Sequence, residues 1–182
     1  MTKSSVGSRF GLVLTALALT SAGSFEVGTV WAQPAPATLS PPVLPACISS
    51  PFGPRRQPGP HAAGFHNGVD FPAPVGALVR AAASGTVLQI RRLGSSGLEV
   101  DLRHEDPAGH FFVTRYAHLG TVAPALAEGL RRVARGEVLG RVGRSGITYG
   151  THLHFEVRVA GQPIDPEAFF AVARCDAQGG EP

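Results

Sequence analysis

Short apolar segments that alternate with polar residues constrain the fold of this sequence more than any other feature. In residues 98–103, three aliphatic residues alternate with three charged ones, which is the period of two expected of a half-buried strand. Similar stretches follow at close spacing, bounded by Gly, Pro and charged turns: 78–82, 86–91, 111–118, 138–142 and 152–159. The pattern predicts an all-β fold, mainly an antiparallel sheet or β-sandwich, with one or two short helices at 124–134 and 166–174.

The first 32 residues have the organisation of a secretory signal peptide. Lys3 and Arg9 precede an uninterrupted apolar run at 10–20, and Val30 and Ala32 suit cleavage after Ala32. This run is too short to cross a hydrocarbon layer of about 30 Å as a helix, so a retained membrane anchor is the less favoured alternative. The sequence therefore predicts an exported protein, periplasmic or extracellular, with no stable membrane insertion after cleavage.

Composition divides the rest of the chain into three parts. Residues 33–46 are rich in Pro and Ala and predict an extended linker, residues 47–175 predict a single domain, and residues 176–182 predict a disordered tail. The formal net charge of the whole chain is +3, and no run of basic residues is longer than a pair. This distribution argues against a nucleic-acid partner.

Cys47 and Cys175 are the only two cysteines, and they stand at opposite ends of the predicted domain. Because an exported protein meets an oxidising environment and this spacing suits no metal motif, the pair predicts a disulfide that ties the two ends together. The alternative is that residues 44–47 form a lipoprotein processing site. It is less favoured because such a site would directly follow the apolar run.

The segment 152–159 has two chemically different faces. Its alternation places Leu153, Phe155, Val157 and Val159 on one face and His152, His154, Glu156 and Arg158 on the other. The apolar face predicts packing against a core. Two imidazoles about 7 Å apart along a strand and pointing to one region indicate a metal or catalytic centre, with an exposed strand surface as the alternative.

His66 and Asp70, with Gly68 between them, form a second candidate pair. An imidazole nitrogen and a carboxylate oxygen suit Zn²⁺, and the two side chains could converge across one extended face or round a bend at the glycine. His and Asp also flank ordinary turns as hydrogen-bonding residues, which is the alternative interpretation.

The segment 111–118 ends in a further histidine. Alternation predicts that Phe112, Thr114, Tyr116 and His118 share one face of a strand. Core packing explains the two aromatic residues but gives no reason for the histidine. The remaining histidines fit no motif and are interpreted as turn or surface residues: His61, His104 and His110.

Taken in order, these motifs resemble the lysostaphin/LytM-type zinc endopeptidases of peptidoglycan. The resemblance rests on His66-x-x-x-Asp70, Tyr116-Ala117-His118-Leu119 and His152-Leu153-His154-Phe155-Glu156. It extends over residues 50–169 through the stretches SPFGPR at 50–55, ALVRAAASGTV at 77–87 and EVLGRVG at 137–143. A fold of the LytM type is the expectation.

The resemblance also implies a role for each site residue. It makes His66, Asp70 and His154 the ligands of one Zn²⁺ per chain, with a fourth position open, and His118 and His152 the unliganded catalytic pair. Without the resemblance, the choice between His152 and His154 as the ligand stays open. The division of base, proton donor and oxyanion stabiliser between His118 and His152 also stays open.

The implied function is hydrolysis of the peptide cross-links of bacterial peptidoglycan by a monomer. The alternative is a non-catalytic LytM-like regulator of another cell-wall hydrolase, but such relatives have lost zinc ligands, whereas all five site residues are present here. Glu156 is expected to support the site or form a salt bridge and not to act as the base. Tyr149 and Thr151 depart from the family pattern, which often has Pro in the place of Thr151, and are expected to alter the groove wall near the zinc.

Overall fold

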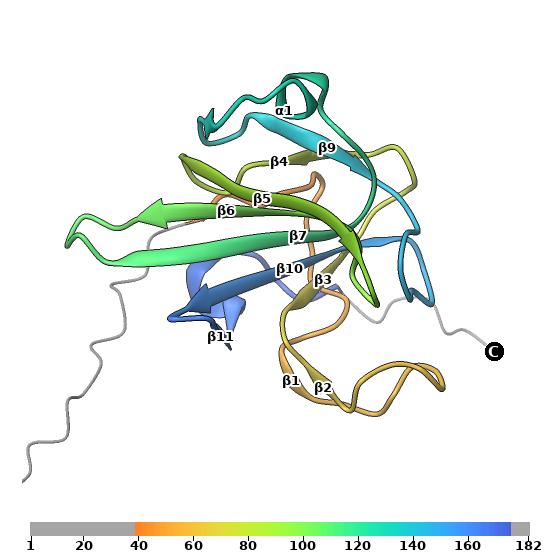
Figure 1. Cartoon of the computed structure of the whole chain (residues 1–182). Coiled ribbons are helices and arrows are strands. Elements are labelled where there is room, and N and C mark those ends of the chain that lie inside the picture. The colour runs from red at the N-terminus through yellow and green to blue at the C-terminus, as the bar shows by residue number, and fades with distance from the viewer. Residues whose placement is uncertain (1–38, 176–182) are drawn as a thin grey trace, which may run out of the picture. The chain divides into compact units, whose positions relative to one another are not determined.

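The computed structural model describes residues 39–175 of the 182-residue chain (Figure 1). Its strands are β1 (Gly53–Pro54), β2 (Phe65–His66), β3 (Val69–Pro72), β4 (Leu78–Arg80), β5 (Gly85–Leu93), β6 (Gly97–Glu105), β7 (Phe111–Val122), β8 (Arg132–Val133), β9 (Val138–Val142), β10 (His152–Val159) and β11 (Gln162–Ile164). Its helices are α1 (Pro124–Ala127) and the 3-10 helix η1 (Pro166–Phe169). The predicted signal peptide, the first part of the predicted linker and the predicted tail lie outside the described residues.

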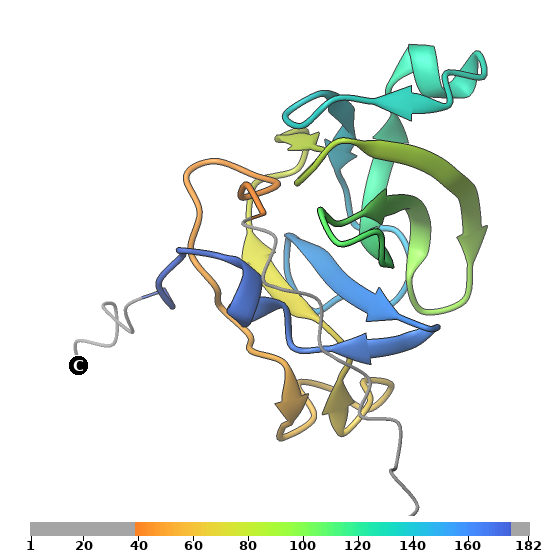
Figure 2. The same cartoon turned by 90° about the vertical axis from the view of Figure 1, so that its left-hand side faces the viewer.

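Nine strands form one antiparallel sheet, which confirms the predicted all-β class. The main path of this sheet is β11-β10-β7-β6-β5-β8; β3 pairs with β10, and β9 pairs with both β4 and β7. Seen at right angles to the first view, the sheet curls and does not lie flat (Figure 2). The short strands β1 and β2 pair separately and carry His66 to the edge of β3.

The core lies against the apolar face that the alternation predicts for β10. Leu153, Phe155 and Val157 are fully buried. The Phe155 ring packs edge-on against Tyr116 of β7 and Phe71 of β3, with ring centroids 5.2 and 6.3 Å away. Because successive side chains of a strand point to opposite faces, burial of this face directs the histidine-bearing face of β10 away from the core.

Both predicted helices are shorter than the sequence suggests. The first, predicted at 124–134, is only α1, because Gly129 turns the chain with a φ of 104° and β8 then pairs with β5. The second, predicted at 166–174, is only η1, because the backbone of residues 173–175 hydrogen-bonds Ile48. In both places, pairing with a distant segment outweighs local helix propensity. Between residues 39 and 175, no helix is both long enough and apolar enough to cross a membrane.

The two ends of the domain are joined to each other and to the core. Cys47 and Cys175 form the predicted disulfide, with their Cα atoms 4.8 Å apart. Leu39 and Val43 lie within the predicted linker, yet both are buried in the hydrophobic core. The packed domain therefore includes residues before Cys47.

Candidate metal centre

Three strands bring His66, Asp70 and His154 to one place. β2 ends at His66, the chain bends at Gly68, and Asp70 follows in β3. β3 pairs with β10 so that Asp70 lies directly opposite His154. A Cβ atom on Gly68 would lie 2.2 Å from the backbone oxygen of Phe155, so this close approach requires glycine. The first two residues thus converge round the glycine bend and not along one extended face.

The polar atoms of this cluster form a nearly equilateral triangle. Asp70 Oδ1 lies 3.1 Å from His66 Nε2 and 3.0 Å from His154 Nδ1, and the two nitrogens are 3.0 Å apart. A tetrahedral Zn²⁺ with bonds of about 2.0–2.1 Å separates its ligand atoms by about 3.3 Å. A small outward movement of the three side chains would therefore accommodate the ion, and the two nitrogens and one oxygen are ligands that zinc accepts.

The far nitrogen of each imidazole contacts an oxygen atom. His66 Nδ1 lies 2.8 Å from the carbonyl oxygen of Pro51, and His154 Nε2 lies 3.1 Å from Oε1 of Glu156. When these far nitrogens donate, the near nitrogens turn lone pairs toward the Asp70 carboxylate. Three acceptor atoms directed at one point repel one another unless a cation or a proton lies between them, so the arrangement fits a metal ion.

Asp70 and His154 each stabilise the charged form of the other. Burial alone would raise the pKa of Asp70, but hydrogen bonds with His154 and His66 lower it far below its usual range. Burial alone would lower the pKa of His154, but hydrogen bonds with Asp70 and Glu156 raise it to about 9. The carboxylate is therefore ionised at neutral pH, and a proton competes with a metal ion for His154.

Glu156 links the cluster to ion pairs that run across the sheet. Its Oε2 accepts a hydrogen bond of 2.5 Å from Arg158 and lies 3.8 Å from Arg115. The Arg115 guanidinium in turn donates to both carboxylate oxygens of Asp101 at 2.9 Å. Because two arginines hold the Glu156 carboxylate, its other oxygen stays directed at His154.

A β-bulge turns His118 toward the cluster. Where β6 advances by two residues, β7 advances by three, and His118 in this stretch has a φ of 61°. Its ring centroid lies 5.0 Å from that of His152 and 5.8 Å from that of His154. The prediction that His118 shares a face with Tyr116 is therefore wrong, because the extra residue shifts the alternation by one.

His118 and His152 lie beside the triangle, and burial favours the neutral form of both imidazoles. Burial lowers the pKa of His118 to about 4 and also lowers the pKa of His152. His118 Nδ1 lies 2.9 Å from the carbonyl oxygen of Ser145, and donation to that oxygen leaves Nε2 as a free acceptor. His152 Nε2 lies 3.6 Å from Asp70 Oδ1, farther than His154 Nδ1, which lies 3.0 Å from the same oxygen.

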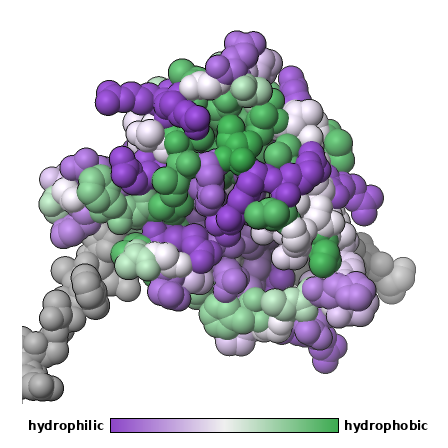
Figure 3. Space-filling view, viewed as in Figure 1, coloured by the Kyte–Doolittle hydropathy of each residue, from purple (hydrophilic) through white to green (hydrophobic). Residues whose placement is uncertain are grey.

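The cluster opens into a groove with a volume of about 610 Å³. The groove lining includes both neutral histidines together with Arg55, Arg115 and Arg158. In the space-filling view, hydrophilic side chains gather across the middle of the face shown in Figure 1, with hydrophobic surface above them (Figure 3). A polar chain such as a peptide can therefore approach the cluster from solvent at His152 and His154, which are partly exposed.

Two residues that orient the site were not identified from the sequence. Ser145 donates from Oγ to the carbonyl oxygen of Leu119 at 2.7 Å and accepts from the backbone of Leu98 at 2.8 Å, which fixes the carbonyl that meets His118. No local pattern distinguishes such a serine. Arg55 lies 3.6 Å from Asp70 Oδ2, and its place in the SPFGPR stretch could have indicated a role at the site.

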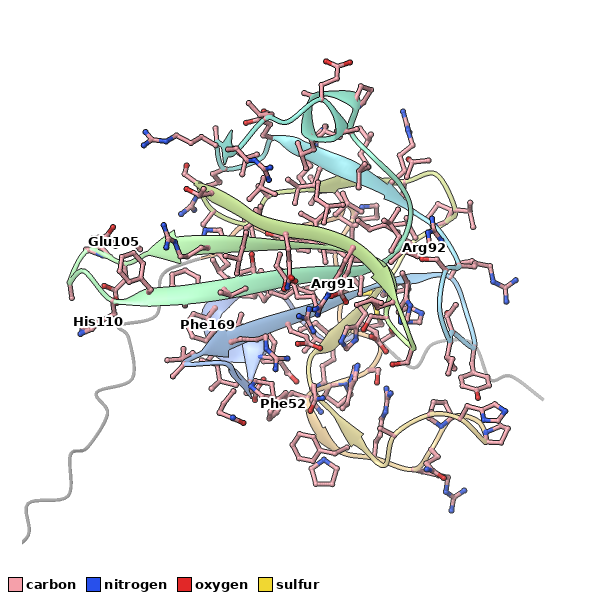
Figure 4. All side chains as sticks on the ribbon, in the orientation of Figure 1. Phe52, Arg91, Arg92, Glu105, His110 and Phe169 are labelled. Carbon is pink, nitrogen blue, oxygen red and sulfur yellow. A yellow bond between two sulfur atoms is a disulfide. The ribbon has the colours of Figure 1, made fainter. Side chains whose placement is uncertain are left out.

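His104 is a core residue, which corrects its interpretation as a turn or surface residue. It is 3% exposed in β6; Nδ1 lies 2.8 Å from the carbonyl oxygen of Ser84, and Nε2 lies 2.7 Å from Thr114 Oγ1. The other two unassigned histidines, His61 and His110, are exposed in turns as predicted. Figure 4 shows His110 at the far end of the β6–β7 hairpin, away from the region of β1 and β2.

The site residues fall within a stretch shared with a known family. The sequence profile of peptidase family M23 matches residues 64–166, more than half of the chain. This chain belongs to peptidase family M23. The predicted resemblance to lysostaphin/LytM-type enzymes is thereby confirmed, since the M23 domain also matches solved structures of that type.

Relatives of the M23 domain include proteins with names that describe peptidoglycan enzymes. The protein named DD-carboxypeptidase/endopeptidase Mpg of Neisseria meningitidis is 41% identical over 125 residues, which are 69% of this chain and 27% of that protein. Peptidoglycan DD-endopeptidase ShyA of Vibrio cholerae is 36% identical over 119 residues, which are 65% of this chain and 26% of that protein. The chain spans about a quarter of the length of these relatives.

Solved structures agree with the fold of the M23 domain. A zinc-containing peptidase from Vibrio cholerae matches with a TM-score of 0.60 and 33% identity over 75% of this chain and 40% of that chain. The catalytic domain of lysostaphin from Staphylococcus simulans matches with a TM-score of 0.56 and 25% identity over 68% of this chain and 91% of that chain. The predicted LytM-type architecture is therefore confirmed.

Proposed function

We propose that this chain is a zinc-dependent endopeptidase that hydrolyses peptide cross-links of bacterial peptidoglycan. The observation that carries the proposal is the triangle of ligand atoms on His66, Asp70 and His154, 3.0–3.1 Å apart, with His118 and His152 beside it. Three protein ligands and an accessible groove are typical of a catalytic zinc site, which leaves one coordination position for water or substrate.

Different residues would bind the ion and orient its ligands. His66, Asp70 and His154 would hold the ion, while the Pro51 carbonyl and the Glu156 carboxylate keep the imidazoles in the ligating tautomer. Zinc held there would supply a Lewis acid that polarises the scissile carbonyl and lowers the pKa of water toward about 7.

Proton transfer would fall to the two neutral histidines. His118 can accept a proton at Nε2, because its Nδ1 is directed at the Ser145 carbonyl. His152 supplies a second imidazole on the same groove, so the histidine that accepts a proton from water can pass it on to the leaving amine, while the other donates an N–H hydrogen bond to the oxyanion. Burial favours the uncharged form of both, because it lowers their pKa values.

Peptidoglycan is proposed as the substrate because relatives with up to 42% identity carry names of DD-carboxypeptidases and DD-endopeptidases. Export is proposed because residues 1–32 have the pattern of a signal peptide. Amino-terminal sequencing of the protein secreted by a bacterial host tests export, and Gln33 is the expected first residue.

Digestion of purified sacculi tests the proposed activity. Protein stripped with a chelator should release no fragments, and stoichiometric zinc should restore release of uncross-linked muropeptides, which mass spectrometry identifies. If the zinc-loaded protein binds sacculi but cleaves no peptide bond in walls of several chemical types, the endopeptidase proposal is wrong and a regulator of another hydrolase is indicated.

A further inference from the structure

Two loops meet at one end of the groove through Tyr149. One loop joins β1 to β2, and the other joins β9 to β10; both lie on the same side of the molecule (Figure 1). The Tyr149 hydroxyl accepts a hydrogen bond of 3.0 Å from the backbone N–H of His61. The Tyr149 ring covers Gly59 so closely that a Cβ atom there would lie 2.1 Å from the ring. We call this contact the Tyr149 bridge.

The Tyr149 bridge belongs to the groove and not to the hydrophobic core. Tyr149 is 47% exposed and lines the groove together with Ile147 on its own loop and Phe65 beside the other loop. The groove lining then continues along β10 past His152 and His154. An exposed aromatic ring that spans two loops contributes little to the core, so its position is better explained by an effect on what enters the groove.

The distance along the chain limits the space beside the site. Two residues, Gly150 and Thr151, separate Tyr149 from His152, and the three fully extended steps from one to the other span at most about 11 Å. A substrate that lies along the groove therefore has room for no more than about three extended residues between the histidines and the bridge. A longer or branched arm on that side would have to pass beside the ring, which slows cleavage of such a substrate without excluding it from the groove.

We propose that Tyr149 is a specificity-determining residue that favours peptides with a short arm on one side of the scissile bond over cross-linked peptides with long arms on both sides. This inference rests on the proposed peptidase function. It assigns the bridge a role in ranking substrates and not in the chemical step.

Two different substitutions open the bridge. Tyr149→Ala removes the ring, and Gly59→Ala displaces the ring by placing a methyl group where it lies. With a linear stem pentapeptide and a cross-linked muropeptide dimer as substrates, each variant should raise the ratio of kcat/KM for the dimer to kcat/KM for the pentapeptide about tenfold. Bound zinc should be unchanged. Gly64→Ala is the matched control, because no atom lies within 4 Å of its added Cβ.

The double variant and hydrogen exchange separate the bridge from a general loss of structure. If both substitutions act through one contact, Gly59→Ala should have no further effect in the Tyr149→Ala protein. The His61 amide should exchange with solvent faster in Tyr149→Phe than in the parent, because the phenolic acceptor is lost.

The outcomes distinguish this proposal from the proposed function. If the parent cleaves both substrates but the ratio stays within twofold in Tyr149→Ala and Gly59→Ala, the specificity role is wrong and the peptidase function stands. If the parent cleaves neither substrate with zinc bound, the proposed function fails, and the specificity role fails with it. Unchanged exchange at His61 in Tyr149→Phe would show that the bridge is not formed in solution.

Discussion

Three imidazoles at the candidate metal centre are each oriented by the oxygen atom that the far ring nitrogen contacts. The Pro51 carbonyl orients His66, the Glu156 carboxylate orients His154, and the Ser145 carbonyl orients His118. These contacts leave one nitrogen of each ring directed into the site, which is why histidines from three separate strands can act on one centre.

Alanine substitution should separate the metal ligands from the proton-transfer residues. We expect His154→Ala to lose bound zinc and all hydrolysis, because two ligands remain. His118→Ala should keep stoichiometric zinc and lose about 10²- to 10⁴-fold in kcat, the usual contribution of a general acid or base. Metal analysis and muropeptide hydrolysis measure the two effects. His110→Ala, an exposed residue of the β6–β7 hairpin, is the control. Parental cleavage by zinc-loaded His154→Ala would refute the ligand assignment.

Neutralising Glu156 should weaken zinc binding without unfolding the domain. The Glu156→Gln side chain can still accept the hydrogen bond from His154 but no longer carries the charge that increases the basicity of the ring. We expect the Kd for zinc to rise about 10- to 100-fold, measured by competition with a chromophoric chelator. Glu105→Gln, an exposed residue of the β6–β7 hairpin, should bind zinc as the parent does. An unchanged Kd in Glu156→Gln would show that Glu156 does not influence zinc binding.

At the scale of the elements, two local features place the site residues. The glycine bend between β2 and β3 brings Asp70 opposite His154, and the bulge in β7 turns His118 out of the alternation of its strand. A residue other than glycine with positive φ costs of order 1–3 kcal/mol, and such strain is often found at functional sites. The φ of 61° at His118 agrees with that tendency.

An added methyl group at the bend should separate the ligands. In Gly68→Ala the Cβ atom would lie 2.2 Å from the Phe155 backbone oxygen, so β2 and β3 must move away from β10. We expect the free energy of unfolding to fall by about 1–3 kcal/mol, as for other overpacked sites, together with weaker zinc binding. Urea denaturation and zinc titration measure these effects. Gly64→Ala is again the control, and equal zinc affinity in both variants would contradict the role of the bend.

His104 should make the stability of the β6–β7 pair depend on pH. Burial lowers the pKa of His104, so below its ordinary value near 6.5 the unfolded chain binds more protons than the folded chain. Stability should therefore fall as the pH drops from 7 toward 5. His104→Gln cannot take up a proton, so its free energy of unfolding, measured by urea denaturation, should change less with pH over this range. If the free energy of unfolding depends on pH equally in both proteins, His104 does not contribute to that dependence.

At the scale of the whole domain, one disulfide closes a loop that contains nearly all of the described residues. The Cys47–Cys175 disulfide joins residues 128 positions apart. In the chain-entropy model, a loop of about 100 residues or more corresponds to a stabilisation of about 4.7 kcal/mol. The bond constrains the unfolded chain and does not contact the metal ligands, whose positions depend on pairing of β3 with β10.

Removing both cysteines should therefore lower stability while leaving zinc affinity intact. We expect Cys47→Ala/Cys175→Ala to lose about 2–5 kcal/mol of unfolding free energy and to bind zinc as the parent does while folded. Urea denaturation with and without reductant measures the loss, and reductant should affect only the parent. Equal midpoints for the parent in both conditions would show that the disulfide does not form.

The sequence determined the class of the fold and the two faces of β10, and it predicted the residues of the candidate site. Alternation with a period of two is a local property, so it identifies the buried and the exposed side of a strand before any partner is known. Only the tertiary structure decided that His118 leaves the face of Tyr116, that His104 is buried and that Tyr149 contacts His61. These outcomes depend on strand register and on contacts between residues far apart in the chain, and a local sequence pattern contains neither.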